Sequence, residues 1–143
     1  MQKNPEQLTC ISIIVCENVY RDETTKNLII IGTFNKIAAP KLPCTFQRMC
    51  VLFTVTNGRG TYNVALSIVH EETAHQVAQL HGPMTISDPL AINDINVELR
   101  NLVFPSAGKY WVELKADEAI LQQRPFLVEV STATAQEQRD ADR

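Results

Sequence analysis

Apolar and polar residues alternate along most of the chain with a repeat of two. The alternation is regular in residues 61–68, 110–115 and 126–130, where every second residue is apolar. A repeat of two with one apolar face is typical of strands in an antiparallel sheet that packs on one side. No segment of ten residues has a clean helical stripe. The pattern predicts eight strands, at 8–18, 27–37, 48–56, 61–70, 75–80, 95–104, 109–116 and 120–130.

Glycine, proline and acidic residues separate these predicted strands. The clearest turn signals are Asn57–Gly60, Gly82-Pro83, Asp88-Pro89 and Pro105–Gly108. Many short strands between such turns, without alternating helices, indicate an all-β chain. The expected fold is an antiparallel β-sandwich of the immunoglobulin-like, Greek-key kind, with about seven or eight strands.

The ordered part of the chain is expected to form one domain, residues 8–130. The chain has 143 residues, a length that suits a single domain, and no linker divides it. Residues 1–7 are polar and are expected to be flexible. Residues 131–143 contain no apolar residue larger than alanine, so they cannot offset the entropy of ordering and are expected to be disordered.

One segment has a sharper pattern, Leu99-x-x-Leu102-x-x-Pro105-x-x-Gly108-x-Tyr110. Two apolar residues, a Pro/Gly turn and a tyrosine that opens the next strand resemble the tyrosine corner of Greek-key sandwiches. In that motif the tyrosine hydroxyl bonds a backbone group upstream and fixes an arch between the two sheets. The pattern therefore predicts a structural role for Tyr110 and not a catalytic one.

Three runs are apolar on both faces of their predicted strands: Ile13–Val15, Leu28–Ile31 and Val51–Phe53. A strand of this kind needs cover on both faces. Such a run lies either at the centre of the sandwich under a loop or on a surface that contacts a second subunit.

Trp111 has the opposite parity to Tyr110 and Val112, which places it on the outer face of its predicted sheet. An outward tryptophan is a candidate for a protein interface or for stacking on a ligand. A third interpretation is that lysine and glutamate stems on neighbouring strands half-cover it and that it has no further role.

The four cysteines are expected to be free thiols, most of them buried. Cys10 and Cys16 lie six residues apart in one predicted strand, so they share a face but are about 20 Å apart, too far for a disulfide. Cys44 and Cys50 have the same separation, and no C-x-x-C pair exists. A disulfide, or a thiolate metal site drawn from both pairs, stays an alternative, and the reactivity of the four thiols is left open.

The segment His70–His75 resembles a zinc-protease helix, but its histidines stand at i and i+5 rather than i and i+4. The flanking segments are strands, so a hairpin with the loop Glu71–Ala74 and with His70 opposite His75 is the better interpretation. Two imidazoles are weak metal candidates, because a zinc site needs at least three protein ligands. A solvated hairpin end is expected, and no metal or cofactor is predicted.

Charge and known motifs narrow the function classes further. The formal net charge is -3, which gives no electrostatic reason to expect nucleic acid or an anionic membrane as a partner. The first residues lack the apolar stretch of a signal peptide, so a cytoplasmic location is expected. The chain has no nucleophile elbow, phosphate loop or dinucleotide-binding glycine motif, so we expect no enzyme activity.

Several features stand in order along residues 8–130: an opening strand with Cys16, then Asn27–Ile37, Pro40–Pro43, Met49–Val55, Phe104-Pro105-x-x-Gly108-x-Tyr110 and Phe126–Val130. Taken together, they resemble a family of small bacterial proteins catalogued only as a domain of unknown function. The resemblance implies a β-sandwich without an established activity, so it implies no catalytic residues.

Three functional hypotheses follow from these observations. The leading one is a non-enzymatic β-sandwich that forms a homo-oligomer or docks on a partner protein, because of the doubly apolar runs and the outward Trp111. The alternative is a small-ligand or carbohydrate-binding module that uses Trp111 and loop tyrosines such as Tyr20. The third is a metal-dependent enzyme centred on His70 and His75.

Overall fold

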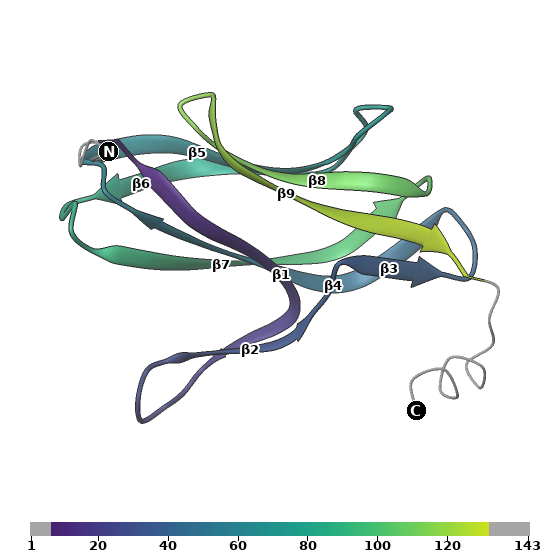
Figure 1. Ribbon diagram of the computed structural model, residues 1–143, viewed down its shortest axis with the longest axis horizontal. Helices are drawn as coiled ribbons and strands as arrows, with labels where there is room; N and C mark the ends of the chain where they lie inside the picture. The colour runs from purple at the N-terminus through teal and green to yellow at the C-terminus, as the bar shows by residue number, and fades with distance from the viewer. Residues whose placement is uncertain (1–6, 132–143) are drawn as a thin grey trace.

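The computed structural model describes residues 7–131. Within this range the chain forms β-strands and no helix (Figure 1). Within the same range no helix is long and apolar enough to cross a membrane. The strands in chain order are β1 (Thr9–Arg21), β2 (Leu28–Thr33), β3 (Lys36–Ala39), β4 (Cys44–Thr56), β5 (Gly60–His70), β6 (Gln76–Ile86), β7 (Ile92–Phe104), β8 (Gly108–Ala116) and β9 (Ala119–Val130).

These nine strands form two sheets that face each other. The first sheet has the order β2-β1-β4-β7, and the second has the order β3-β9-β8-β5-β6. Neighbouring strands are antiparallel except β3 and β9, which run parallel. The predicted all-β sandwich is confirmed, with nine described strands in place of seven or eight.

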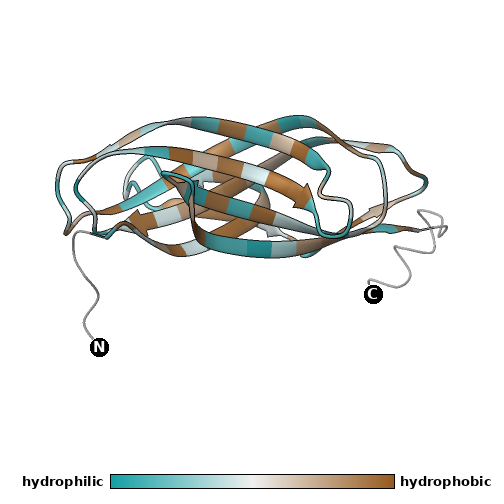
Figure 2. Cartoon of the chain, turned by 90° about the horizontal axis from the view of Figure 1, so that it is seen from above, coloured by the Kyte–Doolittle hydropathy of each residue, from teal (hydrophilic) through white to brown (hydrophobic). Residues whose placement is uncertain are grey.

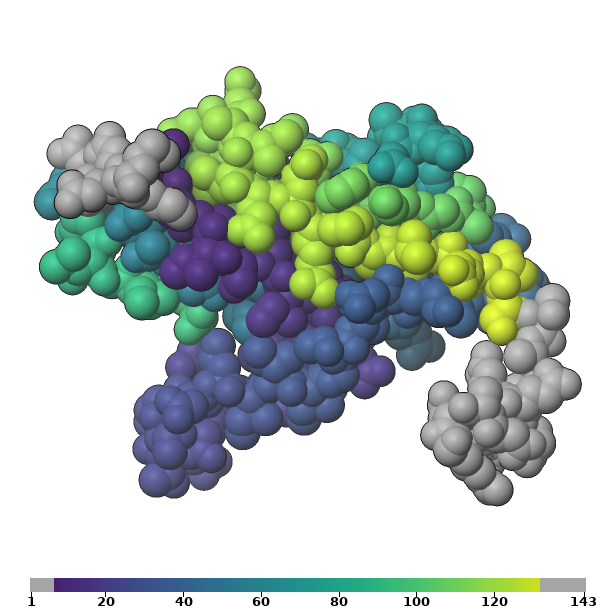
Figure 3. Space-filling model, in the orientation of Figure 1, coloured from purple at the N-terminus to yellow at the C-terminus, as the bar shows by residue number. Residues whose placement is uncertain are grey.

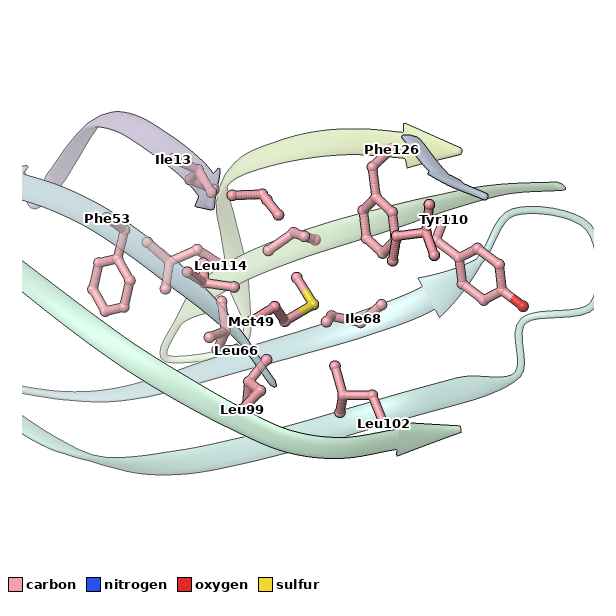
Figure 4. Close-up of a cluster of buried hydrophobic side chains, with 14 of the residues drawn as sticks. Ile13, Met49, Phe53, Leu66, Ile68, Leu99, Leu102, Tyr110, Leu114 and Phe126 are labelled. Atoms are coloured by element: carbon pink, nitrogen blue, oxygen red, sulfur yellow. The ribbon is translucent and has the colours of Figure 1, made fainter. Parts of the chain in front are cut away.

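The core lies between the sheets and is filled by inward-facing residues from both. Val51 of the first sheet and Ile68 and Val112 of the second have no exposed surface. Hydrophobic and hydrophilic positions alternate along the strands, as the sequence predicts (Figure 2). Met49 of the first sheet and Leu114 of the second both belong to this cluster of buried side chains (Figure 4). Each fully buried side chain of this size contributes about 1.5–3 kcal/mol of stability.

Three fully buried aromatic rings fill one end of the core. The ring of Tyr110 lies 5.1 Å from that of Phe104 and 5.8 Å from that of Phe126, centroid to centroid. The Tyr110 hydroxyl points out of the cluster (Figure 4) and donates a hydrogen bond to the Ser106 carbonyl at 2.6 Å. Ser106 belongs to the arch that carries the chain from β7 in the first sheet to β8 in the second, so this bond ties the arch to the core.

The predicted strand 27–37 is divided in the structure into β2 of the first sheet and β3 of the second. Gly32 at the end of β2 has a φ of 69°, which turns the chain out of the strand. Phe34 then packs between Phe46 and Phe126, at centroid distances of 5.7 and 6.5 Å. The Leu127 N–H donates to the Asn35 carbonyl at 2.8 Å, next to the parallel pairing of β3 with β9.

The predicted turn at Gly82-Pro83 is wrong, because β6 runs through both residues to Ile86. Pro83 stands opposite Asn63 of β5. β6 is one of the two edge strands of the second sheet, and a strand with one free edge tolerates a proline whose missing N–H would face away from its neighbour.

The two predicted flexible ends fall almost wholly outside the described residues, which begin at Gln7 and end at Ser131. Leu8 is already part of the core, with 4% of its surface exposed. The described sandwich therefore spans the segment in which a single domain is expected.

Candidate interaction surface

The first two strands continue past the sheet as a two-stranded arm, defined as residues 17–33. β1 pairs with β4 as far as Cys16, which lies opposite Cys50. From Asn18 to Arg21, β2 is the partner of β1 among the described strands. The arm, purple to blue in Figures 1 and 3, projects from the body of the sandwich.

A hydrogen-bonded turn closes the tip of the arm. The Asp22 N–H donates to the Asn27 carbonyl at 2.8 Å, and the Lys26 N–H donates to the Asp22 carbonyl at 2.9 Å. The Asp22 carboxylate accepts hydrogen bonds from the N–H groups of Thr25 and Thr24, both at 2.8 Å, and these bonds hold the pKa of Asp22 below its usual value. The turn is thus formed by its own residues, without help from the rest of the sandwich.

Large apolar side chains cover both faces of the arm. Tyr20 is 52% exposed and lies opposite Ile29, which is 45% exposed; Ile31, on the same face, is 44% exposed. On the other face Ile30 is 38% exposed and lies opposite Val19. Large contiguous apolar patches are uncommon on protein surfaces and are typical of interaction sites, so the arm is a candidate for one.

β2 is also an edge strand of the first sheet. It pairs with β1 on one side, and its other edge has no partner among the described strands. Edge strands are usually protected from further pairing by lysines, prolines or bulges. The strand Leu28–Thr33 contains no charged residue and no proline. The arm therefore combines an unpaired backbone edge with an uncovered apolar surface.

The doubly apolar run Leu28–Ile31 is the sequence signal for this surface. Of the two placements that the sequence leaves open, the structure shows the exposed one, because no loop among the described residues buries the run. The runs Ile13–Val15 and Val51–Phe53 instead lie side by side on β1 and β4 within the sheet. Tyr20, expected in a loop, lies in β1.

Trp111 lies half-buried on the outer face of the second sheet, beside its cross-strand neighbours Val69 and Pro125. Its indole N–H donates to a Glu71 carboxylate oxygen at 3.2 Å, and the Lys109 ammonium lies 5.9 Å from the ring centroid. These contacts use the polar atom and one face of the ring. Lys109 lies on β8 itself and Glu71 lies in the hairpin turn, so these two contacts do not come from neighbouring strands.

The two weak metal candidates, His70 and His75, have different surroundings. His75 is exposed, whereas His70 is buried with 4% of its surface exposed. Nδ1 of His70 accepts hydrogen bonds from the N–H groups of Glu72 and Thr73, both at 3.1 Å. The proton is therefore assigned to Nε2, which donates to the Ala107 carbonyl at 2.9 Å. The two nitrogens thus link the hairpin, through Nδ1, to the arch, through Nε2. Among residues 7–131, no three or more metal-ligating side chains form a group that could hold a metal ion.

All four cysteines are free thiols, and Cys16 and Cys50 have no exposed surface. The prediction that Cys10 and Cys16 share a face is wrong. A β-bulge between Cys10 and Ser12 reverses the parity of β1, so Cys10 packs against the core whereas Cys16 faces outward beside Cys50. Burial raises the pKa of Cys10, Cys16 and Cys44.

Two hollows are candidate sites for a small ligand. The first, of about 310 Å³, is an apolar groove where the edge strands β6 and β7 part; its walls include Phe53, Leu80, Met84, Ile95 and Val97. The second, of about 520 Å³, lies on the outer face of the second sheet, and most of its walls come from residues with polar or charged ends: Asn63, Gln79, His81, Lys115 and Glu118.

The sequence matches a family of unknown function, DUF6941, over residues 11–129. The chain belongs to this family. The match extends from β1 to β9, so the DUF6941 region includes the arm as well as both sheets. The expected resemblance to a domain of unknown function is confirmed. No curated protein sequence matches the chain.

Several solved structures are similar in fold to this DUF6941 sandwich. The alkylpurine DNA glycosylase AlkC from Pseudomonas fluorescens, bound to DNA with an abasic site analog, has a TM-score of 0.53 at 13% identity, over 85% of this chain and 30% of that protein. An immunoglobulin-like protein from Pseudomonas aeruginosa has a TM-score of 0.44 at 9% identity, over 88% of this chain and 99% of that protein. A β-D-glucoside glucohydrolase from Trichoderma reesei has a TM-score of 0.46 at 12% identity, over 86% of this chain and 19% of that protein.

These similarities are limited to the fold. The chain spans about a third of the glycosylase, and at 13% identity that match indicates a shared sandwich architecture and nothing about activity. The other two TM-scores support no argument.

Proposed function

We propose that this protein is a non-enzymatic β-sandwich that self-associates through the arm, by pairing β2 of one copy with β2 of a second. The observation that supports the proposal is the presence, on one strand, of a backbone edge without a partner among residues 7–131 and of three exposed isoleucines. Scattered exposed apolar residues are common on protein surfaces. Together with a free edge they supply both the hydrogen bonds and the apolar contacts of a strand-to-strand interface.

A second copy suits this strand because β2 is self-complementary. Two β2 strands related by a two-fold axis run antiparallel, and an axis at Ile30 places Ile29 of one copy opposite Ile31 of the other. Cross-strand pairs of β-branched residues are favourable by about 0.2–1 kcal/mol each. β2 carries no charge, so the pairing brings no like charges together.

The apolar part of the gain is comparable with the cost of association. Full burial of an isoleucine is worth about 1.5–3 kcal/mol. Ile29, Ile30 and Ile31 are 38–45% exposed, so completing their burial would be worth about 2–4 kcal/mol per copy and twice that per dimer; this is an upper limit, because edge pairing covers only one flank of each side chain. Association costs about 4–15 kcal/mol, and the edge hydrogen bonds offset part of that cost. We therefore expect a dimer of moderate affinity that dissociates on dilution.

The proposal is tested by measuring solution mass by light scattering across a wide range of protein concentration. The informative variant is Ile30→Lys, which places a charge at the centre of β2 in the manner of protected edge strands. The matched control is Ile120→Lys, because Ile120 is also an exposed strand isoleucine, at 54%, but lies in β9 of the other sheet. Circular dichroism establishes that both variants keep the sandwich.

The expected result is a dimer for the wild type and for Ile120→Lys, and a monomer for Ile30→Lys at the same concentration. A wild type that stays monomeric at every concentration contradicts the proposal. So does a dimer that Ile30→Lys leaves intact. Trp111→Ala separates the two candidate surfaces, because loss of the dimer in that variant alone would move the interface to the outer face of the second sheet.

The apolar groove between β6 and β7 supports a second candidate, a module that binds a small apolar ligand. Its volume of about 310 Å³ is at the lower end of the range for small-molecule sites, which begins at about 300 Å³. A panel of medium-chain fatty acids and alcohols, screened by thermal shift, tests this candidate. If a compound raises the Tm of the wild type by binding in the groove, Leu80→Asp should abolish that rise. If no compound raises the Tm of the wild type, this second candidate is rejected.

A further inference from the structure

We propose that Cys16 and Cys50 form a dithiol site that closes to a cross-strand disulfide by exchange with a small-molecule disulfide. The site lies at the root of the arm. The proposal is separate from self-association and does not depend on it.

The two cysteines occupy directly opposed positions on neighbouring antiparallel strands. Cys16 of β1 and Cys50 of β4 are register partners, next to the inward pair Val15 and Val51. Opposed residues on antiparallel strands have Cα atoms about 4.5–5.5 Å apart, and disulfides join Cα atoms about 4.4–6.8 Å apart. The backbone spacing therefore suits a disulfide without a change of register.

The two sulfur atoms lie over the same short stretch of β1. Cys16 Sγ is 3.6 Å from the Asn18 carbonyl oxygen, and Cys50 Sγ is 3.8 Å from the Glu17 carbonyl oxygen. Neither cysteine has exposed surface. Burial raises the pKa of Cys16, and the nearby Cys50 and Glu17 act in the same direction. The influence of one thiol on the other agrees with their close approach.

The position of the pair at the root of the arm gives it room to close. Opposed Cβ atoms are about 4.5–5.5 Å apart, whereas a disulfide needs about 3.5–4.5 Å, so the strands must approach by about 1 Å. Cys16 and Cys50 are the last pair between β1 and β4 before β1 enters the arm. A residue pair at the end of a strand ladder shifts and opens more readily than a pair in its middle. The same local opening gives the small-molecule disulfide access to the buried thiols.

Closure is a balanced exchange of two thiols for one disulfide. The thiolate of one cysteine attacks the small-molecule disulfide, which forms a mixed disulfide and releases one small thiolate. The second cysteine thiolate then attacks the cysteine sulfur of the mixed disulfide and releases the other small thiolate. The two protein thiols are oxidised, one small disulfide is reduced, and the two thiol protons end on the released thiols. In a reducing compartment such a bond is transient and reports the redox state.

The other two cysteines provide an internal control. Cys10 lies opposite Val55, and Cys44 lies opposite Phe104, so neither has a thiol as its cross-strand neighbour. Both pack against the core on the inner face, away from the Cys16–Cys50 pair. We expect neither of them to form an intramolecular disulfide in the folded chain.

The test measures the disulfide equilibrium of the full chain in glutathione buffers of increasing oxidised-to-reduced ratio. The double variant Cys10→Ser/Cys44→Ser keeps the two proposed thiols alone. After an acid quench, mass spectrometry is expected to show a loss of two hydrogen atoms and a cross-linked peptide that contains Cys16 and Cys50. We expect the disulfide-to-dithiol ratio to be at least about tenfold higher in the folded chain than in the urea-unfolded chain, with the same value reached from the reduced and oxidised sides.

A ratio that is equal or lower in the folded chain overturns the proposal. So do glutathione adducts on both cysteines without a cross-link. Light scattering on the same samples measures self-association separately. A chain that forms no disulfide can therefore be distinguished from a chain that forms no dimer. Cys16→Ser, which cannot close the bond, identifies any mass loss that comes from another reaction.

Discussion

Replacing Tyr110 with phenylalanine removes one hydroxyl from the end of the core and leaves the ring in place. The ring is fully buried, and its contacts with Phe104 and Phe126 do not involve the oxygen. The bond lost is the 2.6 Å hydrogen bond to the Ser106 carbonyl in the arch between the sheets. The substitution therefore isolates the contribution of that bond.

The expected loss of stability is about 2 kcal/mol. A hydrogen bond contributes about 0.5–1.5 kcal/mol net, and a carbonyl left without a partner costs about 1–3 kcal/mol. Ser106 is half-buried, so water replaces part of what the carbonyl loses. For a domain of this size, a loss of about 2 kcal/mol lowers the Tm by about 6–12 °C.

Urea unfolding monitored by circular dichroism measures this loss, with the slope against urea unchanged. The matched control is Tyr20→Phe, which removes the same hydroxyl from a side chain that is 52% exposed and is expected to change stability by less than about 0.5 kcal/mol. If Tyr110→Phe is as neutral as the control, the arch is held by other contacts. A loss above about 4 kcal/mol would mean that the ring itself has moved.

Three further predictions concern local geometry and charge. Gly108→Ala should cost about 2 kcal/mol or more in urea unfolding, because the new Cβ would lie 2.8 Å from His70 Nε2 at a φ of 131°; unchanged stability would contradict that geometry. Pro83→Ala should change the free energy of unfolding by less than about 1 kcal/mol, since Pro83 lies on an edge strand; a larger loss would contradict the edge position. A hydrogen bond from Arg48 holds the pKa of Glu98 below its usual value. The stability that the Glu98 carboxylate gives the folded chain is therefore fully present at a pH above the ordinary glutamate pKa, and it is lost as the pH falls through the lowered pKa of the folded state. The stability difference between the wild type and Glu98→Gln, measured by urea unfolding across pH, should shrink on acidification, and a constant difference would contradict this.

The strands were predictable where one face of the sheet is buried, because burial imposes a repeat of two on the sequence. The switch of the chain from β2 to β3 was not predictable in the same way. It depends on Phe34 contacting Phe46 and Phe126, residues that are distant in the sequence. The continuation of β6 through Pro83 likewise depends on its edge position, which the local sequence does not encode.

The candidate sites show the same division between local and long-range information. The run Leu28–Ile31 indicated an apolar surface, but only the sheet order shows that this surface lies on a free edge. The pairing of Cys16 with Cys50 depends on β1 lying beside β4, a strand order that the sequence does not encode. The bond from His70 to the Ala107 carbonyl joins segments 37 residues apart, so the hairpin alone could not reveal it.

Hydrogen exchange of the β2 backbone as a function of protein concentration tests the central claim most directly. In an edge strand the N–H groups that point away from the neighbouring strand exchange freely, whereas pairing with a second copy protects them. We predict that the peptide covering Leu28–Thr33 gains protection as the concentration rises, that Ile30→Lys abolishes the gain, and that β6, an edge strand of the second sheet, shows none. Association without added protection in β2 would contradict the account, because the interface would then lie elsewhere.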